Sequence, residues 1–166
     1  MQIQNAFYIR LGKGGEWESS SIRDGLLRFG WSASLLADVN AGAWDKIKQQ
    51  LRAARYFAQT ATRDVNALRE IVSSTGEDVW IAFHHSRLWW CRLAPGPVEE
   101  DSTSRFRRTA AGWSDSDAAG RTLQIATIPS DISQLQGFRG AVYQVKAADS
   151  LRRLLGAETR VSVEVR

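Results

Sequence analysis

Residues 79–93, VWIAFHHSRLWWCRL, contain two runs of alternating side chains on either side of the polar break HHSR. Residues 79–83 alternate with the two-residue period of a β-strand, and residues 88–93 do the same. Two such runs around a short polar break predict an antiparallel hairpin. Within it, Trp89 and Trp90 are neighbours and therefore point to opposite faces of the sheet.

The rest of the chain predicts strands at its start and end, and helices in its first half. Residues 7–11 (FYIRL) form a first strand that runs into the glycine-rich turn GKGGEW. The glycine spacing is not that of a Walker loop or a dinucleotide-binding fingerprint. Apolar residues at spacings of three and four predict the principal helices. We expect a helix that starts at residues 19–21, carries Ile22 and Leu26 and closes at 29–31, further helices at 35–40, 44–58, 60–72, 132–135 and 149–155, and strands at 121–128, 141–145 and 161–165.

These elements predict one α+β domain over residues 1–166, in which a curved sheet or small β-barrel is flanked by helices. A chain of 166 residues is long enough to bury one substantial core. Residues 94–104, with two prolines and an acidic triplet, predict an exposed loop.

Composition limits the class of protein. No apolar run approaches the roughly 18 residues that span a bilayer. The N-terminal residues lack the basic and apolar regions of a signal peptide. The single cysteine, Cys91, excludes an internal disulfide and a multi-cysteine zinc site. We therefore expect a cytoplasmic protein with no membrane partner.

Aromatic and basic residues carry the functional signal. The net charge of +4 favours polyanionic partners, because Lys and Arg that neutralise phosphates release counterions. Trp17, Trp31 and Trp113 stand beside glycine or polar turn residues, where large aromatics often mark a recognition surface. Such rings can hold an extruded base by stacking, and Trp90 lines the pocket if its face of the hairpin turns toward it. The basic residues near these aromatics predict a phosphate-binding set: Lys13, Arg28, Arg105, Arg107, Arg108 and Arg139.

Residue spacing marks no catalytic or metal constellation. His84 and His85 are the only histidines, and as neighbours in a hairpin turn they cannot both face one metal. Two interpretations of this pair stay open: the histidines are solvent-exposed turn residues, or they contact a phosphate. Asp115 and Asp117 lack the strand-borne acid and lysine of a metal-dependent nuclease core. The sequence therefore predicts no catalytic residue, no metal and no cofactor.

The order of FYIRL, RFGWSAS and the hairpin VWIAFHHSRLWWCRL resembles the PUA-like superfamily, which includes EVE, YTH, ASCH and SRA domains. The segments GEW and RFGW are also similar to N-terminal reader domains of bacterial modification-dependent restriction proteins. The resemblance to YTH domains implies that Trp31 is a wall of an aromatic cage for a methylated base. It also implies a polar contact from Ser32 or Ser34 and a second cage aromatic near Trp113. Residues 44–72 are longer than the corresponding part of a minimal YTH or EVE domain.

The resulting hypothesis is a non-enzymatic reader that flips a modified base, in DNA rather than RNA, into an aromatic pocket. An effector nuclease would act as its partner or as a fused domain. Two alternatives stay open: a nucleic-acid-processing enzyme such as a nuclease or deaminase, and a module that binds a small molecule or a protein through the same pocket. The predicted pocket residues are Trp17, Trp31, Ser32, Trp90 and Trp113.

Overall fold

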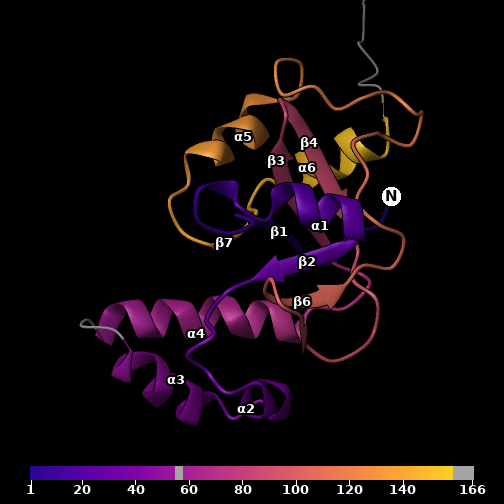
Figure 1. Ribbon diagram of the computed structural model, residues 1–166. Helices are drawn as coiled ribbons and strands as arrows, with labels where there is room; N and C mark the ends of the chain where they lie inside the picture. Colours follow the sequence, from indigo (N-terminus) through magenta and orange to yellow (C-terminus); the bar gives the residue numbers. More distant parts are fainter. Residues whose placement is uncertain (55–57, 159–166) are drawn as a thin grey trace, which may run out of the picture.

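The computed structural model describes residues 1–54 and 58–158, whose strands form two sheets (Figure 1). Sheet A has the strand order β4–β3–β1–β7, and sheet B has the order β2–β6–β5. The strands are β1 (Ala6–Ile9), β2 (Leu26–Phe29), β3 (Val79–His84), β4 (Arg87–Cys91), β5 (Glu99–Glu100), β6 (Arg105–Arg108) and β7 (Val142–Gln144).

The helices other than α1, which packs beside β2, form two groups (Figure 1). Figure 1 shows α2, α3 and α4 below β2 and β6, whereas α5 and α6 lie beside β3 and β4. Within the described residues, no helix has the length and apolar character needed to cross a membrane. The helices are α1 (Glu18–Asp24), α2 (Leu36–Ala41), α3 (Trp44–Ala53), α4 (Ala58–Ser73), α5 (Ser130–Ser133) and α6 (Ala148–Leu155), with 3-10 turns η1 (Lys13–Gly15) and η2 (Gln134–Gly137).

The hairpin predicted from residues 79–93 is confirmed. Strands β3 and β4 pair in antiparallel register from Trp80↔Cys91 to His84↔Arg87. Only His85 and Ser86 lie between the strands, and their φ angles are 50° and 62°. Positive φ at both central residues is the backbone of the tight turn that matches the twist of a hairpin.

Sheet A is covered on both faces, which explains why its central strands are apolar on both. On β1, Phe7 and Ile9 belong to a core cluster shared with α3 and α4, whereas Tyr8 belongs to a second cluster shared with α5 and α6. Trp89 packs against the first cluster and Trp90 against the second. The prediction that these two tryptophans point to opposite faces is therefore confirmed.

The α+β class is confirmed, but the two sheets of the described residues are not closed into a barrel. Residues 26–29 were expected to extend a helix, and this was wrong: α1 ends at Asp24, and β2 pairs with β6. Residues 121–128 form isolated bridges and turns rather than a strand. The helices expected at 35–40, 60–72, 132–135 and 149–155 and the strand at 141–145 are present within a few residues. The helix expected at 44–58 is present as α3, which ends at Ala53, and positions 55–57 of that prediction lie outside the described residues. The strand expected at 161–165 lies outside the described residues.

Candidate functional site

The topology of sheet A brings three chain segments to one edge. Strands β1 and β3 are parallel, so their carboxyl ends, after Ile9 and at His84, lie at the same edge. Strand β7 is antiparallel to β1 and starts there, with Val142 paired to Ile9. The Arg10 amide continues this pairing by donating to the carbonyl of Ala141 (2.8 Å). We call this edge the carboxyl edge of sheet A.

The glycine-rich loop after β1 leads from this edge into α1. Gly12 has φ 84°, and a Cβ at this position would lie 3.0 Å from the Trp17 ring and 2.6 Å from Glu16 Cγ. On its other side, Trp17 lies over Gly30, where a Cβ would be 3.7 Å from Trp17 Cη2. The indole is thus packed between two glycine positions, and it fixes the start of α1 against the end of β2.

A cavity of about 450 Å³ opens between the start of α1, the β3–β4 turn and η2. Its volume lies in the usual range of small-ligand pockets, roughly 300–1,000 Å³. Phe83 forms part of its apolar wall, and the Phe83 ring lies 5.7 Å from that of Tyr8. The polar residues that line it include Glu18, His84 and Gln136.

One hydrogen-bonded chain orders the polar side of this cavity. His84 Nδ1 lies 2.8 Å from Glu18 Oε1, and His84 Nε2 lies 3.4 Å from Ser19 Oγ. The His84 carbonyl accepts from Trp89 Nε1 (3.1 Å), which holds the strand end in place. His85 lies beside His84, with their ring centroids 3.9 Å apart. Burial raises the pKa of the nearby Tyr8 phenol, Arg10 lowers it and Glu18 raises it.

Three exposed cations surround the carboxyl edge: Arg10 just after β1, Lys13 in η1, and Arg139 in the turn before β7. In the part of the chain that the structure describes, none of the three forms an ion pair. Lys13 and Arg139 belong to the predicted phosphate-binding set, whereas Arg10 was missed because the sequence places it inside the first predicted strand, 7–11, rather than beside an aromatic turn.

The other predicted phosphate ligands are engaged within the protein. Arg28 is 3% exposed and forms a bidentate ion pair with Asp101 (2.8 and 2.9 Å). Arg107 is 4% exposed and donates to the carbonyls of Ile71, Ser74 and Ala94. Arg108 is exposed but forms an ion pair with Glu99 (2.7 Å).

Arg105 is also buried, and its guanidinium stabilises the backbone around Trp31 and Ser34. Its guanidinium donates to Ser34 Oγ (2.7 Å), to the Ser34 carbonyl and to the Trp31 carbonyl (3.2 Å). Trp31 has a φ of 64°, which is strained for a bulky residue. The Arg105 bond and two further bonds from Ser34 to the Trp31 carbonyl hold that conformation. Arg28, Arg105 and Arg107 are therefore structural in this fold, because most of their donors already have acceptors; of these donors, only Arg28 Nε and Arg107 Nε are buried without a hydrogen-bond partner among the described residues.

The predicted tryptophan pocket is not assembled as expected. Trp17 and Trp31 are both half-buried and both adjoin Gly30, and Ser32 beside them is exposed. Trp113 is 9% exposed, and its Nε1 donates to the Leu26 carbonyl (2.8 Å). Trp90 lies on the other face of sheet A, where its Nε1 donates to the Ser116 carbonyl (2.9 Å). The correction has a physical reason, because buried indole N–H groups need a partner and both find backbone carbonyls.

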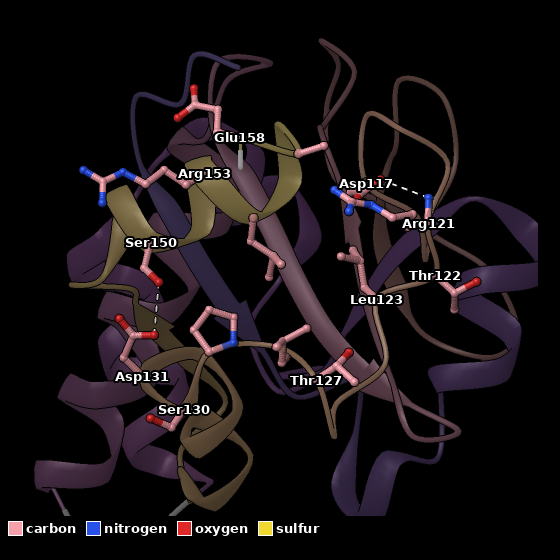
Figure 2. Close-up of a pocket in the computed structure, with 14 residues that line it drawn as sticks. Asp117, Arg121, Thr122, Leu123, Thr127, Ser130, Asp131, Ser150, Arg153 and Glu158 are labelled. Atoms are coloured by element: carbon pink, nitrogen blue, oxygen red, sulfur yellow. Dashed lines mark hydrogen bonds and ion pairs between the residues drawn. The ribbon is translucent and has the colours of Figure 1, made fainter. Parts of the chain in front are cut away.

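A larger cavity of about 960 Å³ lies between α6 and residues 117–131 (Figure 2). Its floor includes Leu123, and its rim is charged. Figure 2 shows that several rim groups pair with one another: Asp117 with Arg121 (3.1 Å), and Asp131 with Ser150 (3.1 Å). Paired groups do not distinguish the two cavities, since Glu18 and His84 also pair in the smaller one. The smaller cavity is the better candidate site because it lies at the same sheet edge as Arg10, Lys13 and Arg139, which form no ion pair within the described residues.

The comparisons with known proteins leave the family open. The chain matches no protein-family model, no curated protein and no solved structure. The resemblance to PUA-like domains therefore stays a prediction. Among the described residues, no group of three or more His, Cys, Asp or Glu side chains is placed to hold a metal ion.

Proposed function

We propose that this chain is a nucleic-acid-binding reader that contacts phosphates at the carboxyl edge of sheet A. It would hold one extruded base in the cavity beside Glu18 and His84. The observation that carries the proposal is the set of three exposed cations that form no ion pair within the described residues and lie at the same sheet edge as a cavity with an aromatic wall. Cations bind the phosphate backbone, and an aromatic face can stack on a base.

The proposal moves the base pocket from the tryptophans to the cavity of Phe83. Base extrusion needs a cavity that excludes the strand but admits one base, and polar groups that reach the base edge. Phe83 supplies an apolar face, while Glu18 and Gln136 supply polar groups. The modification on the base, and the preference for DNA over RNA, rest on the sequence resemblance to modification readers. An effector nuclease, as a partner or as a further domain of a longer chain, would deliver the consequence of reading.

The test measures the affinity for short duplexes that differ at one base: unmodified, N6-methyladenine, 5-methylcytosine or a bulkier 5-substituted cytosine. We expect salt-sensitive binding, tightest to one modified member. Replacing Arg10, Lys13 and Arg139 together with Gln should weaken binding to every duplex. The matched control replaces Lys46, Arg52 and Arg63, three cations exposed on α3 and α4, with Gln. Equal loss in both variants would contradict the assignment of the surface.

The chain Glu18–His84–Ser19 favours a second candidate function, ester hydrolysis. A hydroxyl, an imidazole and an orienting carboxylate in hydrogen-bonding order are the signature of an activated serine, and such contacts are often loose without substrate. Ser19 Oγ would bond to the acyl carbon while His84 carries its proton to the leaving alkoxide, and water would then release the acid. A fluorophosphonate probe should label Ser19 but not the Ser19→Ala variant. Labelling that persists in Ser19→Ala, or is absent from the unmodified chain, rules out this candidate.

A further inference from the structure

Within the cavity at the carboxyl edge, Glu18 is the one carboxylate among the described lining residues. An ionised carboxylate only accepts hydrogen bonds, whereas a serine hydroxyl or a glutamine amide can donate or accept. Among the side chains that line the cavity, Glu18 therefore acts only as a hydrogen-bond acceptor. A ligand group that lies against Glu18 has to be a donor.

The Glu18 carboxylate is held in one orientation. Its Oε1 is 2.8 Å from His84 Nδ1. Its Oε2 lies against the glycine loop, where a Cβ at Gly15 would overlap it. The Glu18 and His84 side chains are 26% and 17% exposed. Each carboxylate oxygen offers two acceptor positions, so Oε1 can accept from a ligand as well as from His84.

We propose that Glu18 is the specificity-determining residue of the site and selects an extruded base that bears an exocyclic amino group at the edge it reads. This inference rests on the proposed function. Cytosine-type bases present an amino donor where uracil and thymine present a carbonyl oxygen, and carboxylates accept from the cytosine amino group elsewhere. A carbonyl oxygen against Glu18 would leave two acceptors facing each other without a donor.

The sharpest comparison is between 5-methylcytosine and thymine, which share the methyl group and differ at the amino position. Each base is placed opposite an abasic analogue in the same duplex, so that neither has a pairing partner to lose when it leaves the stack. Affinity is measured by fluorescence anisotropy at fixed salt. We expect the unmodified chain to bind the 5-methylcytosine duplex about 5- to 100-fold more tightly, the usual range for one base-reading contact.

Two variants separate base reading from charge. Glu18→Gln replaces the acceptor with an amide that can donate to a carbonyl, so the ratio of the two affinities should fall to about one or reverse. Glu16→Gln removes the same charge from an exposed residue two positions earlier, which does not line the cavity, and should keep the ratio. The ratio of the two affinities for the unmodified chain tests the inference even if a variant does not fold.

Equal affinities of the unmodified chain for the two duplexes would overturn this inference while leaving the proposed function in place. The same follows if Glu16→Gln changes the ratio as much as Glu18→Gln. Absence of binding to every duplex at low salt would overturn the proposed function, and this inference with it.

Discussion

At the scale of single residues, the RFRR segment of β6 shows that adjacent residues of the same type can have different environments. Arg107 and Arg108 are neighbours with the same chemistry, yet Arg107 is buried among three carbonyl acceptors and Arg108 faces solvent. No spacing rule reveals this, because the acceptors come from the end of α4 and from Ala94, far along the chain. The basic cluster therefore predicted a phosphate-binding surface. In the fold, the guanidinium groups of Arg105 and Arg107 are instead buried and donate hydrogen bonds to acceptors inside the protein.

This difference gives a paired prediction for stability. Arg107→Met should lower the free energy of unfolding by about 3 kcal/mol, since buried acceptors that lose their donors each cost about 1–3 kcal/mol. Arg108→Met should change it little, because an exposed ion pair adds little to stability. Urea denaturation of both variants measures the effect. Similar losses in the two variants would contradict the internal role of Arg107.

Asp101 gives a prediction for pH. The hydrogen bond from Arg28, followed by the backbone amide of Ser104, holds the pKa of the Asp101 carboxyl well below its ordinary value. In the unfolded chain Asp101 takes up its proton at its ordinary pKa, about 4. Its stabilising contribution is therefore present above that pH and is lost as the pH falls toward the lower folded-state pKa.

Asp101→Asn should accordingly destabilise the protein more at pH 7 than at pH 3. Urea denaturation at the two pH values gives the difference in unfolding free energy directly. A penalty that is the same at both pH values would show that ionisation of Asp101 does not couple to folding.

At the scale of elements, the local signals were reliable where pairing partners are close in sequence. The hairpin of β3 and β4 follows from two-residue alternation around a short turn, and α3 and α4 follow from their apolar stripes. Strand β2 was missed because LLRF is a short apolar run whose partner, β6, lies almost 80 residues later in the chain. Residues 121–128 show the opposite error, since alternation without a neighbouring strand gives only isolated bridges.

The glycine-rich loop offers a paired prediction at this scale. Gly12→Ala should lower the unfolding free energy more than Gly14→Ala. Gly14 has the left-handed helical conformation, which costs about 1–2 kcal/mol for a residue with a Cβ. Gly12, at φ 84° and ψ 167°, lies in a region that essentially only glycine adopts. Only at Gly12 would the Cβ also press on Trp17 and Glu16, whereas at Gly14 nothing lies within 4 Å. Thermal denaturation of both variants compares them, and equal losses would contradict the packing role of Gly12.

At the scale of the whole molecule, the sequence predicted some residues of the candidate site but not where in the fold the site lies. Lys13 and Arg139 were predicted as phosphate ligands and do lie at the carboxyl edge. Glu18, Phe83 and Gln136 were missed, because they come from three segments more than 50 residues apart, which the pairing of β1 with both β3 and β7 brings together. Trp113 was chosen for its polar turn neighbours and Trp90 for its face of the hairpin, but the indole N–H of each is bonded to a backbone carbonyl, that of Leu26 for Trp113 and that of Ser116 for Trp90.

The salt dependence of binding tests the central claim most directly. Each phosphate contact in a duplex contributes about −0.9 to the slope of log affinity against log salt concentration. With three cations at the carboxyl edge, we predict a slope on the order of −3 for the unmodified chain. The slope should be close to zero when Arg10, Lys13 and Arg139 are all replaced with Gln. An affinity that does not change with salt, or a slope that survives the triple replacement, would contradict nucleic-acid binding at this edge.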